Sequence, residues 1–349
     1  MNGRGTAVNT PNRFERLHRE PLELEVEYED DRPPFKTVFY DDASRSILAR
    51  NDSPDIPFTY SVNPYRGCEH GCIYCYARPS HEYLGFSAGL DFESKIMVKR
   101  DAPALLDDAL SSAHWNPQMV SLSGNTDCYQ PVERVLRLTR GCLEAFLNHR
   151  NPVGVITKNT LVTRDSDLLG SMARHGIVRV ILSMITLDPA LTRVMEPRTA
   201  TPAKRLLAMR QLAEAGIPVG INVAPVIPGL TDEEIPAILT AAWEHGASFA
   251  SWSPVRLPGA VEPLFVRWIT QTLPDRSEKV LNRIRSIHGG TLNDSRFGMR
   301  MRGNGTIAEM IDDLFSLHAR KLGLDGGAPE LSTANFRRMA KGQMDLFEH

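Results

Sequence analysis

The sequence predicts an α/β fold, in the form of a partial (β/α)6 barrel with an N-terminal arm and a helical C-terminal extension. Two observations lead to this prediction. Short apolar runs alternate with amphipathic helical stretches between about residues 60 and 257, which is typical of a parallel sheet covered by helices. The repeat holds six strand–helix units, which suits an incomplete barrel better than one closed by eight.

Most of the expected strands are short runs rich in branched apolar residues. They cover residues 120–123, 153–157, 178–184, 219–223 and 249–252. Residues 225–229 contain two prolines and a glycine, so we expect them to form a loop.

The helices between these strands are indicated by apolar periodicity and by end signals. Residues 131–149 are expected to form one helix, with Val135, Leu138, Cys142, Ala145 and Phe146 on its apolar face. Further helices are expected over residues 165–175, from Thr201 and Pro202 to Gly216, and after Thr231.

Composition divides the chain into four parts. Residues 1–55 are polar and rich in charge and proline, and we expect an extended arm that lies on the main domain. A disordered leader is the alternative for residues 1–20. Residues 56–257 contain the barrel, residues 258–325 are expected to be mostly helical, and the polar residues 326–349 are expected to form a mobile tail.

Charge and hydropathy exclude some classes of protein. The net charge of −2 gives no evidence for binding to nucleic acid or membrane. No apolar run is long enough to cross a bilayer, and the first residues lack the apolar stretch of a secretory signal. We therefore expect a cytoplasmic protein with no membrane partner, whose clustered cysteines are metal ligands or catalysts and not disulfides.

Three of the five cysteines lie close together as Cys68, Cys72 and Cys75. Three thiolates on one short loop can hold three irons of a [4Fe–4S] cluster. Such clusters usually have four cysteine ligands, so the fourth iron is left open for a substrate or cofactor. The alternative is a structural zinc site completed by His70 or His81.

This cysteine loop resembles that of the radical S-adenosylmethionine (SAM) enzymes, in which an aromatic residue precedes the third cysteine, as Tyr74 does here. The resemblance implies that Cys68, Cys72 and Cys75 bind the cluster. It also implies that SAM chelates the open iron through its amino and carboxylate groups. Electron transfer into the sulfonium then releases a 5′-deoxyadenosyl radical, while the protein binds, orients and excludes water.

The resemblance extends over nearly the whole chain. Residues 63–67 and 76–79, which flank the cysteine loop, resemble a branch of radical SAM proteins related to spore photoproduct lyase and often labelled DNA repair photolyases. Within that branch, the chain resembles one uncharacterised bacterial family most clearly in five stretches. They are residues 3–5, 9–14, 41–42, 51–57 and 68–83. The resemblance implies the partial barrel and supplies no substrate.

A second polar motif, residues 123–133, follows the expected strand at 120–123. Active sites of barrels lie on the loops at the carboxyl ends of the strands, so Ser123 and Asp127 are candidates to bind SAM or the substrate. The same residues alternatively form only a helix cap and a turn.

Cys128 lies in this motif and is a candidate catalytic residue. Spore photoproduct lyase uses an extra cysteine as a hydrogen-atom donor, and Gly124 holds the corresponding place here. We therefore expect a reaction that differs from that lyase, with Cys128 facing the pocket as a possible donor. The alternative is that Cys128 is a small buried core residue.

Further SAM contacts are implied by resemblance, and Tyr74 is one of the expected cofactor contacts. Lys158 and Ser183, each at the end of an expected strand, correspond to residues that contact the carboxylate and ribose of SAM. Arg198 is a candidate for SAM or an anionic substrate. Residues 225–229 resemble the loop that packs on adenine, or are only a rigid turn.

The C-terminal residues suggest a protein partner. Gln343, Leu346 and Phe347 resemble the short peptide with which bacterial polymerases and repair proteins dock on the sliding clamp. Leu346 and Phe347 would fill an apolar pocket, at a cost in the conformational entropy of the tail. The alternative is a tail that folds back on its own domain.

Basic residues in the last sixty positions give a weaker indication of DNA binding. They are Arg296, Arg300, Arg302, Arg320, Lys321, Arg337, Arg338 and Lys341. A solvated helix face is the alternative interpretation.

These observations together predict a radical SAM enzyme with a [4Fe–4S] cluster that abstracts hydrogen from nucleic acid, with damaged DNA as the leading substrate. An electron donor such as flavodoxin or ferredoxin is an expected partner. The alternatives are radical modification of RNA, protein or a metabolite, and a zinc-stabilised, non-catalytic protein that associates with the clamp.

Overall fold

The structure is a computed structural model that describes residues 3–14 and 37–339. Its main sheet has seven strands in the order β10-β9-β8-β7-β6-β3-β2. The strands are β2 (Leu48–Arg50), β3 (Tyr60–Val62), β6 (Val120–Leu122), β7 (Val153–Thr157), β8 (Val178–Met184), β9 (Val219–Val226) and β10 (Phe249–Pro254).

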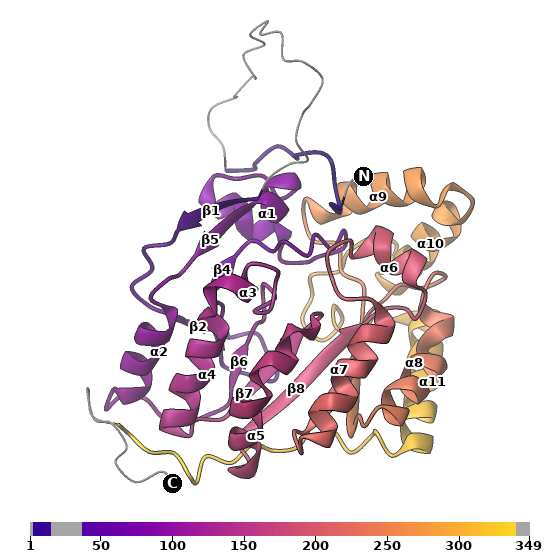
Figure 1. Cartoon of the computed structure of the whole chain (residues 1–349). Coiled ribbons are helices and arrows are strands. Elements are labelled where there is room, and N and C mark those ends of the chain that lie inside the picture. Colours follow the sequence, from indigo (N-terminus) through magenta and orange to yellow (C-terminus); the bar gives the residue numbers. More distant parts are fainter. Residues whose placement is uncertain (1–2, 15–36, 340–349) are drawn as a thin grey trace, which may run out of the picture.

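Six strands of this sheet run parallel and lie in sequence order, and β2 pairs antiparallel with β3. Because β10 and β2 are the edges, the sheet is an open one, and the predicted partial barrel of six parallel strands is confirmed. Helices join the successive parallel strands and cover one face (Figure 1). They are α2 (Ala102–Ser111), α4 (Leu138–His149), α5 (Ser166–Arg174), α7 (Pro202–Glu214) and α8 (Ile235–Glu244).

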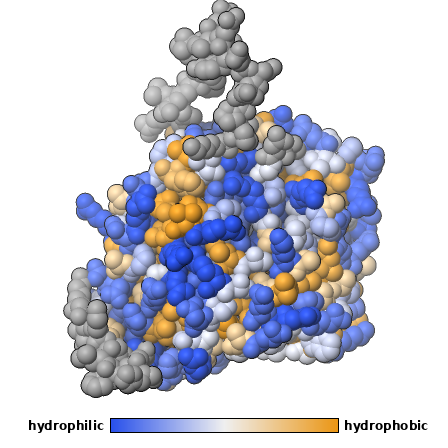
Figure 2. Space-filling model, viewed as in Figure 1, coloured by the Kyte–Doolittle hydropathy of each residue, from blue (hydrophilic) through white to orange (hydrophobic). Residues whose placement is uncertain are grey.

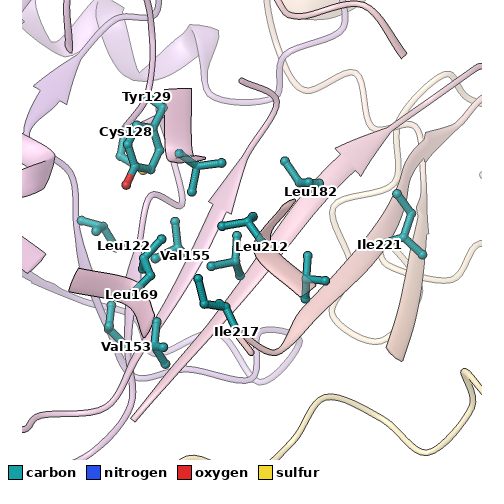
Figure 3. Packing of buried hydrophobic residues seen from close by; sticks show 14 of the residues in the cluster. Leu122, Cys128, Tyr129, Val153, Val155, Leu169, Leu182, Leu212, Ile217 and Ile221 are labelled. Atoms are coloured by element: carbon teal, nitrogen blue, oxygen red, sulfur yellow. The ribbon is translucent and has the colours of Figure 1, made fainter. Parts of the chain in front are cut away.

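Alternate residues of each strand pack against these helices. Val153 and Val155 of β7 and Leu182 of β8 share one buried cluster with Leu169 of α5 and Leu212 of α7 (Figure 3). Burial of such side chains contributes about 1.5–3 kcal/mol each. This helix-side cluster is therefore the main core of the molecule.

The intervening residues point to the opposite, inner face, because side chains alternate along a strand. Ser121 and Gly154 are neighbours in register on β6 and β7. Ser183, Asn222 and Ser251 form a second row across β8, β9 and β10. Closed barrels fill this side with large branched residues. Here the row of Ser183, Asn222 and Ser251 is polar, whereas Ile156, Ile181 and Phe249 on the same face are large and apolar.

The residues that were expected to form one helix, 131–149, form two. α3 (Glu133–Leu136) and α4 are separated by Arg137, whose φ of 53° is uncommon for a residue other than glycine. The interruption changes the direction of the first turns, so Val135 is 78% exposed and does not belong to the apolar face. Cys142 is buried in the core as expected.

Strand β9 is longer than the sequence pattern predicts. It continues through Val226, so Pro225 and Val226 belong to a strand and not to a loop. Val226 pairs with Pro254 of β10, and the Ala224–Pro225 peptide bond is cis. The sheet pairing of the neighbouring strand thus extends β9 beyond its first proline.

A second sheet of three strands, in the order β1-β5-β4, lies beside the first (Figure 1). Its strands are β1 (Val38–Asp41), β4 (Tyr65–Arg66) and β5 (Lys95–Val98). The segment between β4 and β5 contains the clustered cysteines, a 3-10 helix (Arg78–Leu84) and α1 (Leu90–Ser94). This small sheet therefore supports both ends of the cysteine-bearing segment.

The C-terminal extension is helical as predicted, with α9 (Val261–Thr272), α10 (Pro274–Ile287) and α11 (Gly305–Leu322). Residues 326–339 follow α11 and reach the ends of α4 and α5, where Ser332 N donates to Gly176 O and Arg337 N donates to His149 O, each at 2.9 Å. Shorter helical segments elsewhere are Thr160–Asp165, α6 (Pro189–Met195) and Asp232–Glu234.

Polar and apolar residues are interspersed over the face of the molecule seen in Figure 2. In the part of the chain that the structure describes, we find no helix with the length and hydropathy needed to cross a membrane.

Candidate functional site

The three clustered cysteines form a tight loop after β4. Cys68 and Cys72 are buried, Cys75 is half-buried, and all three are free thiols. Gly71 has a φ of +66°, and a Cβ there would lie 2.5 Å from Glu93 Oε2. Only glycine fits such a turn without displacing its neighbours. The sequence therefore specifies a compact loop that brings three thiols together.

Arg78 fixes this loop through hydrogen bonds to its backbone carbonyl groups. Its side chain is fully buried and donates to Cys72 O at 3.0 and 2.9 Å and to Gly71 O at 3.3 Å. Its Nη2 also lies 2.6 Å from Oε1 of Glu93, which is equally buried. Loss of one partner from a buried ion pair costs about 3–5 kcal/mol. Arg78 therefore fixes the backbone that carries Cys72.

The N-terminal segment, residues 3–14, lies against the same loop. Gly5 N donates to Glu93 Oε2 at 2.8 Å, and Thr6 N donates to Glu93 Oε1 at 3.1 Å. A Cβ on Gly5 would lie 1.7 Å from Gly71 O, so the two backbones are in direct contact. The segment and the loop thus share one carboxylate.

Asp127 connects the cysteine loop with the end of β7. Its Oδ1 accepts from Thr157 Oγ1 at 2.7 Å and from Tyr129 N at 2.8 Å. Its Oδ2 accepts from Lys158 N at 2.7 Å and lies 3.3 Å from His70 Nδ1. Each oxygen therefore already has two partners, which makes Asp127 a positioning residue.

The His70–Asp127 contact is an ion pair. Burial alone would raise the pKa of Asp127, but the charge of His70 and the hydrogen bonds to the carboxylate lower it to about 2. Burial would lower the pKa of His70, but the neighbouring Asp127 and Cys68 raise it to about 10. His70 is thus held between the loop and β7.

Tyr74 and Lys158 meet at a second buried carboxylate, that of Glu196, just after α6. The Tyr74 hydroxyl donates to Glu196 Oε1, and Arg205 of α7 pairs with Oε2. Lys158 Nζ lies 4.0 Å from Oε1, and its side chain is 19% exposed. Burial raises the pKa of the Cys72 thiol, as does Glu196, whereas Lys158 lowers it. One partly exposed cation therefore lies beside the cysteine loop.

Three further predicted residues surround this centre. Ser183 is buried at the end of β8, with its side chain on the inner face. Arg198 Nη2 lies 3.4 Å from Oε1 of Glu69 in the cysteine loop. Ser123 has a φ of 80°, and its hydroxyl donates to Thr126 O. The Ser123 hydroxyl therefore closes its own turn.

The position of Cys128 corrects the expectation that this thiol faces the site. Cys128 is fully buried in the helix-side core, in the cluster with Tyr129 and Leu122 (Figure 3). Its carbonyl oxygen accepts a hydrogen bond from Thr139 Oγ1 of α4 at 2.6 Å, and burial raises the pKa of its thiol. This placement matches the small core residue of the alternative interpretation.

Two residues beside the loop were not predicted. Tyr76 follows Cys75 directly, is 45% exposed, and donates its hydroxyl to Gly124 O. The guanidinium carbon of Arg256, just after β10, lies 4.6 Å from the Tyr76 ring centroid. The place of Tyr76 next to the loop was a signal in the sequence. Arg256 gave none, because the contact joins distant parts of the chain.

The donor set fits an iron–sulfur cluster better than a single metal ion. Across residues 3–14 and 37–339, no three His, Cys, Asp or Glu side chains converge closely enough to bind one ion. Among these residues neither His70 nor His81 is grouped with the cysteines as the ligands of one ion. A cluster distributes its thiolate ligands over separate irons, and Cys68, Cys72 and Cys75 would hold it.

A separate depression of about 520 Å³ lies at the opposite ends of the strands, before β9 and β10. Its lining includes Ile217, Pro218, Ser248 and Pro329 and has no ionisable side chain. It shares no residue with the cysteine site.

The candidate clamp-binding residues Gln343, Leu346 and Phe347 lie outside the described residues, as does Lys341. Of the basic residues, Arg296 pairs with Asp294 and Arg300 pairs with Asp55, each at 2.6 Å.

Comparison with known proteins gives an independent assignment. Residues 62–242, more than half of the chain, match the family model of the radical SAM superfamily. An uncharacterized protein of Mycobacterium tuberculosis is 36% identical over 260 residues, which cover 73% of this chain and 75% of that protein. An uncharacterized protein of Methanocaldococcus jannaschii is 27% identical, over 64% of this chain and 80% of that protein.

Solved structures share the fold. Spore photoproduct lyase complexed with dinucleoside spore photoproduct has a TM-score of 0.55 and 18% identity, covering 81% of this chain and 79% of that chain. A double mutant of that lyase with bound AdoMet and dinucleoside spore photoproduct has a TM-score of 0.52 and 18% identity, covering 78% and 76%. The sequence match and the shared fold agree with the cysteine loop: the chain belongs to the radical SAM superfamily and is an enzyme of that superfamily.

Proposed function

We propose that this radical SAM enzyme abstracts a hydrogen atom from a nucleic-acid substrate, with damaged DNA as the leading candidate. The observation that supports the chemistry is the loop with three free thiols, Cys68, Cys72 and Cys75, beside the inner face of an open parallel sheet. Superfamily membership implies a [4Fe–4S] cluster and SAM. Bound together and given one electron, they supply a 5′-deoxyadenosyl radical.

The residues of this chain would orient SAM beside the loop. Lys158 is a partly exposed cation whose nearest carboxylate, that of Glu196, is already paired with Arg205. Its ammonium group therefore suits the carboxylate of SAM as a second anionic partner. Ser183 lies one strand away, and its hydroxyl suits the ribose. Tyr74 holds Glu196 in place for this arrangement.

Three observations support a large substrate of the nucleic-acid class. The sheet is open along one side, and its inner face carries the polar row of Ser183, Asn222 and Ser251 at the carboxyl-terminal part of the strands. The lyase of the same fold is complexed with a dinucleoside photoproduct. These features leave room for a nucleotide to approach the cysteine loop.

The reaction we propose is not a copy of that lyase reaction. All five cysteines lie in the described part of the chain, and the two outside the loop, Cys128 and Cys142, are buried in the helix-side core. A hydrogen atom returned to a substrate radical therefore comes from a group other than these two thiols.

Anaerobic reconstitution tests the proposal. We expect a brown protein with about four irons per chain that cleaves SAM under dithionite. Cys72→Ala should abolish SAM cleavage, whereas Cys128→Ala, matched in chemistry but buried in the core, should retain it. A colourless protein that binds zinc instead would disprove the enzyme. Deuterium transfer from labelled, ultraviolet-damaged oligonucleotides into 5′-deoxyadenosine tests the substrate, and transfer only from RNA, peptide or metabolite pools would contradict DNA.

A further inference from the structure

The connection between β2 and β3, at one edge of the open sheet, is in contact with the C-terminal extension. Asp55, in the connection between β2 and β3, accepts from Gly298 N at 2.6 Å and pairs with Arg300 at 2.6 Å. Gly298 and Arg300 belong to the connection between α10 and α11. These contacts bring the C-terminal extension to the first strands of the barrel, across its open side.

Tyr76 and Arg256 form an aromatic–arginine stack on the barrel, beside these contacts. Tyr76 is 45% exposed and is fixed by the hydrogen bond from its hydroxyl to Gly124 O, in the loop after β6. Arg256, after β10, stacks on its ring at 4.6 Å. The Tyr76 ring therefore joins the cysteine loop to the loop after β6 and to the segment after β10.

A second stack of the same kind lies on the C-terminal extension. Phe297 is 61% exposed, and the guanidinium carbon of Arg300 lies 4.7 Å from its ring centroid. An exposed phenylalanine on a polar connection makes no contribution to the core. The pairing with Arg300 therefore fixes the orientation of a ring that faces solvent.

The charges at these stacks do not cancel. Arg256 is half-buried and makes no hydrogen bond or ion pair to another described residue. Asp55 is the neighbouring carboxylate, and Arg300 and Gly298 N already occupy both of its oxygens. Burial lowers the pKa of Arg256 and the nearby Arg300 lowers it further, whereas Tyr76 and Asp55 raise it. Arg256 and Arg300 thus share the one carboxylate of Asp55, and a partly desolvated cation in this position can accept a second anion.

We infer that the Tyr76–Arg256 and Phe297–Arg300 stacks form a binding surface for unpaired nucleotides at the open side of the barrel. The aromatic rings would stack on bases, while Arg256 contacts a phosphate. Sequence-tolerant binding of single strands uses this combination of ring faces and cations. The inference rests on the proposed function in taking nucleic acid as the substrate class.

The geometry favours an unpaired strand over an intact duplex. Base faces are accessible to side-chain rings only when the bases are unstacked or extruded from the helix. Tyr76 directly follows a cluster ligand, so a base held on that ring is adjacent to the cysteine loop. Lesions that weaken stacking would reach this surface at a lower energetic cost.

Fluorescence anisotropy of the anaerobically reconstituted protein tests the surface with a labelled 12-nucleotide single strand and with the matching duplex. We expect the single strand to bind at least tenfold more tightly. Phe297→Leu and Arg256→Gln should each weaken it about tenfold. Arg256→Gln should also reduce the slope of log K against log salt concentration by about 0.7. This is the contribution that one phosphate contact makes to binding of a single strand.

The matched control is the stack of Arg13 on Phe14 and Tyr83, with ring distances of 4.8 and 5.7 Å, which lies outside the proposed surface. Arg13→Gln and Tyr83→Leu change the same chemistry and should leave single-strand binding within twofold. SAM cleavage without nucleic acid reports on folding, and Phe297→Leu should not change it.

The outcomes distinguish a failure of the proposed substrate class from a failure of the proposed binding surface. If the wild-type protein bound neither strand form, the nucleic-acid substrate itself would be disproved. If it bound the single strand, but Phe297→Leu and Arg256→Gln behaved like the Arg13 and Tyr83 controls, only the location of the surface would be wrong. Tighter binding to the duplex would overturn the preference for unpaired bases.

Discussion

Asp127 illustrates how one carboxylate organises several parts of the site. Sequence position alone made it a candidate for contact with SAM, because it follows a barrel strand. The structure adds that Thr157, Tyr129, Lys158 and His70 surround its two oxygens. Spatial neighbours of this kind come from separate strands and loops, so a sequence pattern cannot reveal that the carboxylate is fully occupied.

Asp127→Asn should destabilise the protein by about 3–5 kcal/mol and lower the iron content after reconstitution. The substitution removes one partner of a buried ion pair and turns an amide donor toward groups that themselves donate. Denaturant unfolding and iron analysis measure the two effects. Asp167→Asn is the control, since Asp167 is 60% exposed in its pair with Arg140 and should cost less than about 1 kcal/mol. Equal losses in both variants would contradict the positioning role.

Substitution of Lys158 tests the proposed binding of the SAM carboxylate. Lys158→Met should raise KM for SAM about tenfold or more, because a charge-assisted hydrogen bond to a carboxylate is lost. Its iron content should stay close to that of the wild type, and Lys158→Arg should recover part of the affinity. An unchanged KM in steady-state SAM cleavage would remove Lys158 from the cofactor site.

At the scale of elements, apolar periodicity predicts most of the barrel correctly. The strands at 153–157 and 178–184 match β7 and β8, because buried parallel strands are continuous apolar runs. The helix break at Arg137 was missed, since an arginine with positive φ leaves no mark in a sequence pattern. The extension of β9 was missed because pairing with β10 overrides the loop preference of Pro225.

The contact between the N-terminal segment and the cysteine loop is testable through Gly5. Gly5→Ala would place a methyl group 1.7 Å from Gly71 O, which forces the segment away from the loop at a cost on the order of 1–3 kcal/mol. We expect faster loss of iron from the reconstituted protein in air, followed by absorbance.

The matched control for that substitution is Gly3→Ala. Gly3, unlike Gly5, has a positive φ of +71°, but a Cβ there meets nothing within 4 Å. The control should lose iron at nearly the wild-type rate. If Gly5→Ala retained iron equally well, the segment would be only a surface attachment.

At the scale of the whole molecule, the cysteine loop alone indicates the superfamily, and the six-unit repeat indicates the open barrel. The inner face and the contacts across the open side were not predictable, since they depend on strand register and on segments far apart in sequence. Asp55 and Arg300 show this, because their ion pair joins residues 245 positions apart in the sequence.

The clamp-like C-terminus stays a prediction for the full chain. Leu346→Ala combined with Phe347→Ala should abolish binding to purified bacterial sliding clamp, because both apolar anchors are removed. A pull-down measures binding, and SAM cleavage by the same variant should be unchanged. Binding that survives the double substitution, or a wild-type protein that does not bind, would exclude this partner.

The shared carboxylate of Glu93 has a consequence for how the enzyme is made. The groups that hold the cysteine loop from behind are Gly5, Thr6, Arg78 and Glu93, and all precede residue 100. They leave the ribosome before most of the barrel strands are translated. The contacts that Arg78, Glu93 and the N-terminal segment make with the cysteine loop can therefore form while the chain is still growing. The later strands then supply the groups that would contact SAM.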